Sequence, residues 1–479
     1  MAHLHELSLV EASARIASGS LTPLELTEAV LARIAAVDGV VGAFVTVTAE
    51  EALREAALAT AEIVAGSYRG PLHGIPVAYK DLIDTAGVAT TASSRVREHH
   101  VPEADAAVVA ALKRAGMVMV GKTHTHEFAY GGVTPTTRNP WDPGRMVGGS
   151  SGGSAAAVSY GGALAAVGTD TAGSIRIPAS LCGVVGFKPT YGRVSRTGVA
   201  SLAWSLDHVG PLARTVTDAA WMLNAMAGHD VRDPGSVTAR VQDFAAGIDD
   251  GVEGLRLGIP VNYFTERIDP ETARMVAAAV ATLVEQGAVV VPMEIPQAEH
   301  FGAVITGIMM PEASAYHRRT LRDTPELYTD EVRGLLEVGE TILATDYIDA
   351  LRFRQSLKAA WRDAVVALDV DVVVTPTVFT TALPADDPVY RWDDGRVDSA
   401  SVGYGRLSIP GNLFGLPTLQ VPCGFSTSGL PVGVQIMGRP FADQTVLRVG
   451  RSVERVQAAS AGEDPAAPHT VPARAPGLQ

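Results

Sequence analysis

The chain has 479 residues, 47% of them hydrophobic and 19% charged, so it can bury a sizeable core, and global disorder is excluded. Asp and Glu number 52 against 38 Lys and Arg, which gives a formal net charge of −14. Because nucleic-acid backbones and anionic membrane surfaces repel an acidic protein, we expect neither as a partner. Two cysteines, Cys182 and Cys423, are too few for a disulfide framework or a four-thiolate zinc site.

The sequence contains no pattern typical of a targeting or membrane segment. Its first residues, MAHLHELSLVEAS, include two glutamates and lack the apolar run of roughly 7–15 residues that a signal peptide needs. No run of about 18 apolar residues is free of breaks and charges, so no transmembrane helix is expected. We therefore predict a soluble protein of a reducing compartment, the cytoplasm.

The N-terminal third alternates helical and extended patterns. Residues 22–25, Thr-Pro-Leu-Glu, supply an N-cap, a proline at the first helical position and a glutamate at the third, and apolar residues then recur at helical spacing. Residues 44–47 are predicted to form a strand. Thr48 and Glu51 are predicted to cap a second helix, which stops at Gly66.

The alternation continues further along the chain. Residues 103–115 are predicted to be helical, and residues 117–120 to form a buried strand. Such alternation favours an α/β fold with a parallel or mixed sheet. Between residues 144 and 192 there are 12 glycines, but runs of Ala and Val lie among them, which predicts a structured core of tight turns rather than a flexible linker.

Loops and chain ends have their own composition. Residues 230–254 are predicted to form a loop-rich connector and residues 384–397 a polar, turn-rich loop. The Pro/Ala-rich tail at 465–479 is expected to fray. No shift in composition divides the remainder, so residues 1–464 are predicted to form a single domain.

Three familiar patterns fit the sequence without their structural context. Residues 116–123 match the P-loop pattern GxxxxGK[ST], but their four central residues resemble a buried strand, so no nucleotide is expected there. Residues 148–152 match the nucleophile elbow GxSxG, but a turn-like segment precedes them where a strand is required, although later histidines leave a Ser–Asp–His order open. His124 and His126 could pair on a metal, but no matching ligands follow, which favours structural or surface roles.

A longer set of motifs carries a clearer signal. Residues 148–154 are Gly-Gly-Ser-Ser-Gly-Gly-Ser, and Ser174 follows Ser150 by 24 residues, within Thr-Ala-Gly-Ser-Ile-Arg at 171–176. Upstream, residues 73–81 are His-Gly-Ile-Pro-Val-Ala-Tyr-Lys-Asp. With these motifs the sequence resembles the amidase signature family of serine amidohydrolases.

The resemblance runs from about residue 72 to 216, which we take as the signature core. It resumes at 412–417, Asn-Leu-Phe-Gly-Leu-Pro, and at 429–435, Gly-Leu-Pro-Val-Gly-Val-Gln. It implies the amidase-signature fold, a central mixed β-sheet surrounded by α-helices. It also implies a catalytic set in which Ser174 is the nucleophile, Ser150 the cis-serine and Lys80 the general base.

The chemistry of these residue types agrees with the implied roles. A serine hydroxyl is a poor nucleophile and needs a base within hydrogen-bond reach. Lysine is charged at its reference pKa of about 10.4, but burial disfavours the ammonium and lowers that value. Lys80 follows an apolar run, so desolvation is expected, and Ser150 can relay the proton from Ser174 to Lys80.

The glycine-rich loop before the nucleophile is expected to form an oxyanion hole. The candidate donors are the backbone N–H groups of Thr171, Ala172, Gly173 and Ser174. Many family members have two glycines before the nucleophile, and here the first is Ala172. The remaining neighbours are expected to support the site, with Asp170 and Arg176 bracing the loop and Ser151 and Thr169 lying just behind it. Cys182 is expected to be an inert core thiol.

The resemblance implies an amidohydrolase that needs neither metal nor cofactor and cleaves an aryl or alkyl carboxamide through an acyl-enzyme on Ser174. A carbamate or urea hydrolase, of the urethanase, allophanate or biuret type, stays open. So does the A subunit of a tRNA-dependent amidotransferase, which typically carries an Asp seven residues before the Asn of the 412–417 motif, where this chain has Gly405.

The partners follow from the same reading. A small-molecule amide is the expected substrate, with no nucleic acid and no membrane as partner, and a homodimer is left open. The substrate pocket is expected from residues 128–133, 309–316 and 384–404, which are partly apolar and aromatic.

Overall fold

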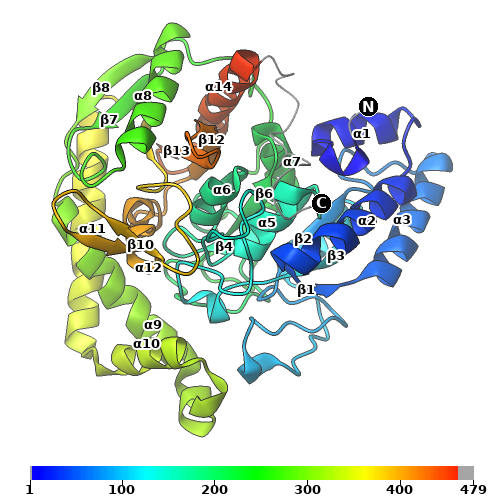
Figure 1. Cartoon of the computed structure of the whole chain (residues 1–479), viewed down its shortest axis with the longest axis horizontal. Helices are drawn as coiled ribbons and strands as arrows, with labels where there is room; N and C mark the ends of the chain where they lie inside the picture. Colours follow the sequence, from blue (N-terminus) through cyan, green and yellow to red (C-terminus); the bar gives the residue numbers. More distant parts are fainter. Residues whose placement is uncertain (1–2, 462–479) are drawn as a thin grey trace.

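A computed structural model describes residues 3–461 of the chain, so the predicted tail at 465–479 and the last residues of the predicted domain lie outside the described residues. Within them, the centre of the molecule is an 11-stranded sheet in the order β1-β3-β2-β4-β6-β5-β12-β13-β9-β7-β8 (Figure 1). Its strands are β1 (Phe44–Val47), β2 (Pro76–Lys80), β3 (Val118–Thr123), β4 (Ala165–Asp170), β5 (Val185–Lys188), β6 (His208–Ala213), β7 (Arg256–Pro260), β8 (Val289–Met293), β9 (Val372–Pro376), β12 (Thr418–Phe425) and β13 (Pro431–Gly438).

The sheet is mixed, as predicted. β2 pairs in parallel with both β3 and β4, and β7 pairs in parallel with both β8 and β9. The other neighbours, from β1 with β3 to β13 with β9, are antiparallel. The α/β fold with a central mixed sheet is therefore confirmed. That residues 1–464 form a single domain stays a prediction.

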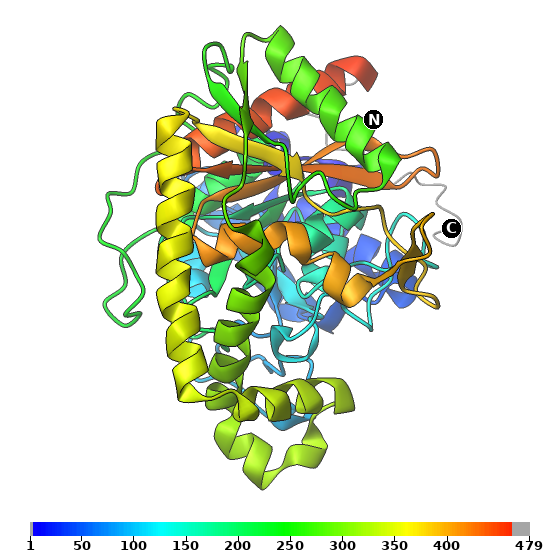
Figure 2. The ribbon, with the colours of Figure 1, turned by 90° about the vertical axis from the view of Figure 1, so that its left-hand side faces the viewer.

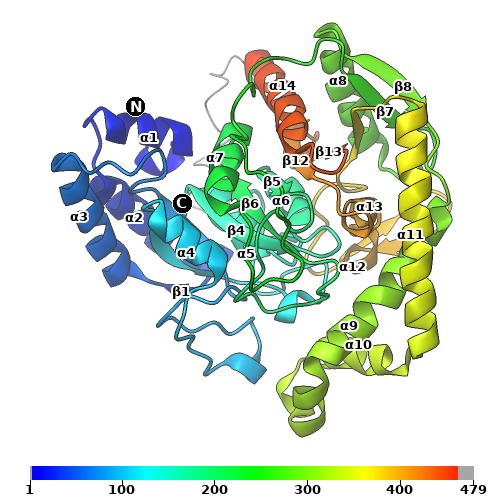
Figure 3. The same ribbon diagram turned by 180° about the vertical axis from the view of Figure 1, so that it is seen from behind.

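Helices surround the sheet. α5 and α6 pack on its middle strands, and α7 and α14 lie side by side over β5, β6 and β12, in front of the sheet in Figure 3. α9 contacts both α10 and α11, and the three helices extend away from the sheet (Figures 1 and 2). The helices are α1 (Leu9–Ala17), α2 (Pro23–Val41), α3 (Ala49–Val64), α4 (Ala107–Arg114), α5 (Gly152–Tyr160), α6 (Arg176–Cys182), α7 (Val216–Met226), α8 (Pro270–Glu285), α9 (Phe301–Asp323), α10 (Asp330–Thr341), α11 (Ala344–Ala367), α12 (Ala400–Gly403), α13 (Ile409–Leu413) and α14 (Asp443–Ala461).

Short elements complete the chain. β10 (Val389–Arg391) and β11 (Val397–Ser399) form a separate two-stranded sheet. The 3-10 turns are η1 (Leu4–Glu6), η2 (Arg95–Arg97), η3 (Glu127–Ala129), η4 (Ala298–His300), η5 (Pro325–Leu327) and η6 (Arg406–Ser408). Over residues 3–461, no helix has the length and apolar character needed to cross a membrane.

The capping patterns in the sequence predicted one helix start fully and another only in part. The capping box at α2 is confirmed, because Thr22 and Glu25 each accept a hydrogen bond from the other's backbone N–H. Thr48 does occupy the N-cap position of α3, as predicted, but its side chain forms no capping hydrogen bond. β1 lies beside β3, so the Thr48 hydroxyl donates instead to the Met119 carbonyl at 3.0 Å.

Two further predictions need correction. The helix expected over 103–115 begins only at Ala107, because the Ala106 N–H donates to the Asp84 carbonyl and the Asp105 carboxylate accepts from the Ala86 N–H, both at 2.8 Å. The loop expected over 384–397 contains β10 and the first residue of β11. The glycine-rich region is structured, as predicted, since every residue of α5, β4 and α6 is buried.

Candidate active site

The sheet brings the predicted catalytic segments together. Lys80 is the last residue of β2, whose neighbour β4 runs parallel to it and ends at Asp170. The carboxyl ends of parallel strands meet at the same edge of a sheet, so Lys80 lies beside the loop that leads from β4 to Ser174. Ser150 reaches the same edge from the turn before α5, and the peptide bond between Gly149 and Ser150 is cis.

Lys80 is the centre of the site. Its side-chain nitrogen Nζ donates to Ser150 Oγ at 2.7 Å and to Thr169 Oγ1 at 2.8 Å, and the side chain is fully buried. Burial lowers the pKa of Lys80 from 10.5 to about 7, and the negative charges of Asp170 and Asp207 oppose that change. Near neutral pH, a large fraction of Lys80 is therefore an uncharged amine hydrogen-bonded to a serine.

Ser174 lies in the loop between β4 and α6. It is 8% exposed and lines a cavity of about 370 Å³. Among the described residues, no group forms a hydrogen bond with its hydroxyl, which leaves Oγ facing the cavity without a protein partner. The Ser151 N–H donates to the Ser174 carbonyl at 3.1 Å, so the two serine loops lie side by side. Ser151 Oγ in turn donates to the Thr169 carbonyl at 3.1 Å.

The backbone around the nucleophile is held by a carboxylate. Asp170 accepts hydrogen bonds from the Gly173 N–H at 2.7 Å and the Ile175 N–H at 3.1 Å. In the described part of the chain, the N–H groups of Thr171, Ala172 and Ser174 have no protein partner. Of the four predicted oxyanion donors, the Gly173 N–H is thus already hydrogen-bonded to Asp170, and within residues 3–461 the other three are free to bind a substrate oxygen.

The alanine at position 172 causes no backbone strain. Ala172 is absent from the residues that have a positive φ, whereas Gly173 has φ +122°. A Cβ at Gly173 would lie 2.6 Å from Cβ of Ser408, so that position excludes a side chain on two grounds. The departure from the double-glycine pattern therefore falls at the position that tolerates it.

Asp170 and Arg176 form a buried ion pair. Arg176 Nε and one terminal nitrogen donate to the two oxygens of Asp170 at 3.0 Å each, and both side chains are fully buried. Burial opposes the ionisation of Asp170, but the charge and hydrogen bonds of Arg176 outweigh it and hold the pKa of Asp170 below its usual value. The pair is a buried brace and not a surface ion pair.

The two distant motifs converge on this brace. Arg176 donates to Asn412 Oδ1 at 2.6 Å and to Gln435 Oε1 at 2.7 Å. Asn412 Nδ2 also donates to the Asp170 carbonyl at 2.9 Å. The segments at 412–417 and 429–435 therefore hold the loop that carries Ser174, more than 230 residues away in sequence.

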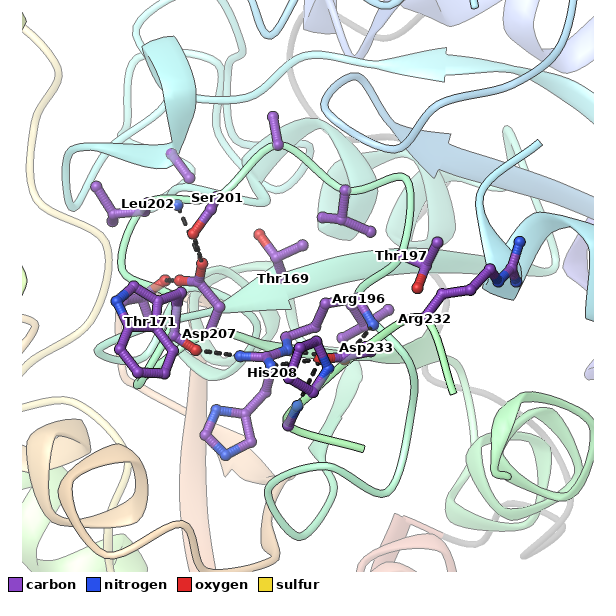
Figure 4. A pocket seen from close by; sticks show the side chains of 17 residues that line it. Thr169, Thr171, Arg196, Thr197, Ser201, Leu202, Asp207, His208, Arg232 and Asp233 are labelled. Atoms are coloured by element: carbon purple, nitrogen blue, oxygen red, sulfur yellow. Dashed lines mark hydrogen bonds and ion pairs between the residues drawn. The ribbon is translucent and has the colours of Figure 1, made fainter. Parts of the chain in front are cut away.

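Sequence reasoning missed Asp207. Its carboxylate accepts from Thr171 Oγ1 at 2.6 Å and from Ser201 Oγ at 2.7 Å, and burial raises its pKa (Figure 4). Asp207 lines a second cavity, of about 490 Å³, together with Thr169 and Thr171. The only sequence signal for its role was that Asp207 is the single charged residue between Arg196 and Arg214.

In the described part of the chain, none of the three misleading patterns has the contacts that its usual function requires. Residues 118–123 form the buried strand β3, in which Lys122 donates to the Ile83 carbonyl and to Thr90 Oγ1 rather than facing a phosphate loop. Within the described residues no histidine side chain hydrogen-bonds to the hydroxyl of Ser150 or Ser174. His126 is buried, and no group of three or more His, Cys, Asp or Glu side chains among residues 3–461 is arranged to hold a metal ion.

The cavity beside Ser174 draws on all three predicted pocket segments. Sequence reasoning missed the contributions of α6, of Leu202, of the first half of α9, of α10 and of the segment from Gly405 to Ile409. The cavity is lined by Ala129, Tyr130, Gly131, Gly132, Thr171, Ala172, Ser174, Ile177, Leu202, Ile305, Thr306, Met309, Met310, Glu331, Leu335, Ser401, Val402, Gly405 and Ile409.

Comparison with known proteins agrees with the geometry. Residues 25–447 match the family model described as Amidase. An amidase of Pseudomonas putida is 48% identical, with 95% of this chain and 97% of that protein aligned. The glutamyl-tRNA(Gln) amidotransferase A subunit of Roseiflexus sp. (strain RS-1) is 43% identical over the same shares of the two chains. A solved structure from a vestigial protein complex that reveals the origins of an s-triazine catabolic enzyme aligns with a TM-score of 0.89 at 35% identity, covering 95% of this chain and 99% of that one.

Proposed function

The chain belongs to the amidase signature family, whose members hydrolyse carbon–nitrogen bonds, and on that premise we propose that it cleaves a small carboxamide through an ester on Ser174. The observation that carries the proposal is the buried Lys80, hydrogen-bonded to Ser150 and Thr169, with its pKa lowered to about 7. A neutral amine in that position can act as a base, and no other lysine or histidine side chain in the described residues hydrogen-bonds to either serine hydroxyl.

The proposed reaction has two halves. Ser174 Oγ attacks the substrate carbonyl while its proton passes to Ser150, and the proton of Ser150 passes to Lys80. The N–H groups of Thr171, Ala172 and Ser174 stabilise the negative charge on the former carbonyl oxygen. The relay then returns the proton to the leaving nitrogen, the C–N bond breaks, and an amine departs. Water, activated by the same relay, hydrolyses the ester and restores Ser174.

The supporting residues have positioning roles in this scheme. Thr169 accepts a hydrogen bond from Lys80 and fixes its amine, and Ser151 joins the two serine loops. Asp170 and Arg176 hold the backbone of the nucleophile loop. We propose no metal and no cofactor for the reaction, a cytoplasmic location, and a small-molecule substrate. The assembly state stays open, with a homodimer as one form.

The amidotransferase A subunit is the second candidate, favoured by the 43% identity to such a protein. Against it stands Gly405, which occupies the position where the family resemblance places an Asp in those proteins. Gly405 lines the cavity beside Ser174, so the missing carboxylate would leave glutamine without that partner. A free-standing amidase is therefore the better proposal.

Nucleophile trapping tests the mechanism. The purified protein is assayed against alkyl amides, anilides, esters, carbamates, ureas and glutamine, with hydroxylamine as competitor of water. Two substrates that share an acyl group and differ in leaving amine should give the same ratio of hydroxamate to acid, because both converge on one acyl-enzyme. Ser174→Ala should abolish turnover, whereas His317→Gln, outside the site, should not.

Two results would contradict the proposal. A hydroxamate ratio that follows the leaving group, with no acylated Ser174 peptide by mass spectrometry, would exclude the shared covalent intermediate. Activity on glutamine alone, appearing only with partner proteins present, would favour the amidotransferase.

A further inference from the structure

The cavity of about 490 Å³ and the cavity beside Ser174 meet at the nucleophile loop, but in the described part of the chain only the first is lined by a hydrogen-bond partner of Lys80. Thr169, which binds Lys80, lines the larger cavity and is absent from the lining of the one beside Ser174. Thr171 lines both cavities, and Figure 4 shows it in the larger one. The proton for the leaving nitrogen comes from the Lys80 relay, so the leaving group belongs on the Thr169 side. The cavity of about 370 Å³ beside Ser174 is then the acyl site.

The acyl site is largely apolar and contains one charged side chain. Its walls are formed largely by Ile, Leu, Met, Val and Ala side chains, and Glu331 is the one charged residue among the described residues that line it. Glu331 lies in the first turn of α10, and its side chain is 57% exposed. Its ion-pair neighbour in the described chain is Nε2 of His126 at 3.7 Å, which is beyond hydrogen-bond distance. The neighbouring His126 lowers the pKa of Glu331, so the carboxylate is ionised at neutral pH.

We propose that the preferred substrate is an amide whose acyl chain is apolar and ends in a cationic amine, which Glu331 binds as an ion pair. This inference rests on the proposed function, since it names the substrate class of the same site. The apolar walls contact the chain between the scissile carbonyl and the amine. Glu331 is a specificity-determining residue and takes no part in bond making or breaking.

The experiment compares matched amides. ω-Aminoalkanamides of increasing chain length are assayed beside alkanamides of equal length, with the unmodified protein, Glu331→Gln and Glu337→Gln. Glu337 lies on the same helix and is exposed outside the cavity, so its variant changes the net charge equally without touching the acyl site. Both substitutions keep the shape of the side chain.

The unmodified protein should show a kcat/KM for one ω-amino length that is higher than for its neutral partner by about 10- to 100-fold, the range of a hydrogen bond to a charged group. Glu331→Gln should lose that preference, and Glu337→Gln should keep it together with the rate on the neutral amide.

A binding measurement separates this inference from the proposed function. Thermal stabilisation of Ser174→Ala by the same amides requires no turnover, and the ω-amino ligand should stabilise it more than the neutral one. Equal stabilisation, equal rates on the paired amides, or a preference that survives Glu331→Gln would each overturn the inference. Absence of hydrolysis together with selective binding of the amine would refute the proposed reaction and leave the binding site standing.

Discussion

Lys80 has to lose its proton before it can accept one from Ser150, so the dependence of kcat/KM on pH tests the site most directly. At pH 7 a lysine with the usual pKa of 10.5 is neutral in only about 3 of 10,000 molecules. With a pKa of about 7, Lys80 is neutral in about half of them. Burial therefore raises the fraction of competent base roughly 10³-fold, which is about 4 kcal/mol in favour of the reactive form at that pH.

The assay is kcat/KM for a neutral amide, measured from acidic to alkaline pH. The rate should rise with pH through a midpoint near 7, because kcat/KM reports the base of the free enzyme. Lys80→Ala should lose activity at every pH, and Ser150→Ala should be severely impaired. A midpoint above about 9, or the same acidic limb in Lys80→Ala, would refute the assignment of Lys80 as the base.

The pH dependence of the unfolding free energy gives an independent measure of the lowered pKa of Lys80. Because the folded-state pKa of Lys80 is depressed, the unfolded chain binds a proton between pH 7 and 10.5 that the folded chain does not, so this residue's contribution to stability rises with pH across that window. The cost of burying Lys80 is fully present below pH 7. The difference in unfolding free energy between Lys80→Met and the unmodified protein should therefore change by up to about 5 kcal/mol across the window, measured by denaturant titration. A flat difference would show that Lys80 stays charged when folded.

Two other predictions follow from the site. Arg176→Met leaves Asp170 buried without its partner, so it should lower the unfolding free energy by about 3–5 kcal/mol in denaturant titration. Where Asp170 stays ionised, its negative charge, no longer neutralised, should raise the pKa of Lys80 and move the acidic limb of kcat/KM to higher pH. An unchanged stability would contradict the role of the brace. Exhaustive chelation should leave activity unchanged, since the proposed relay uses no Lewis acid. Loss on chelation with recovery on adding zinc would instead return His124 and His126 to consideration as ligands.

The parts of the fold that could be predicted are those with local causes. The capping box at Thr22 and Glu25 needs only four consecutive residues, and it formed as expected. The strand at 118–123 was predicted in part from a short apolar run, and that run also explained why the P-loop pattern there was misleading. The alternation of helical and extended patterns favoured a parallel or mixed sheet, and the family resemblance implied the mixed one.

The features that the sequence did not predict depend on contacts between segments far apart in the chain. Thr48 has the sequence of a cap, but β3 offers its hydroxyl a carbonyl from a strand 71 residues later. Asp105 and Ala106 bond to the loop at 84–86, which delays the helix beyond the position that propensity allowed. Asp207 acts on Lys80 only through space, and nothing near it in the sequence indicates that. Contacts of this kind are set by the packing of the sheet, which a local pattern cannot show.

In the proposed mechanism Lys80 must be neutral to act as the base, and the site keeps a carboxylate close to it. The negative charge of Asp170 raises the pKa of Lys80 and so works against catalysis at neutral pH. The same carboxylate is needed, because it holds the N–H groups of Gly173 and Ile175 and thereby the shape of the nucleophile loop. The nucleophile loop therefore requires the negative charge of Asp170, whereas a low pKa for Lys80 is favoured by its absence.

Arg176 resolves this conflict. It neutralises Asp170 within the protein, so the loop keeps its anchor while desolvation still dominates at Lys80. A guanidinium is costly to bury unless its donors are satisfied, and Arg176 donates two hydrogen bonds to Asp170 and one each to Asn412 and Gln435. In the proposed mechanism, the distant motifs therefore help to keep Lys80 a base.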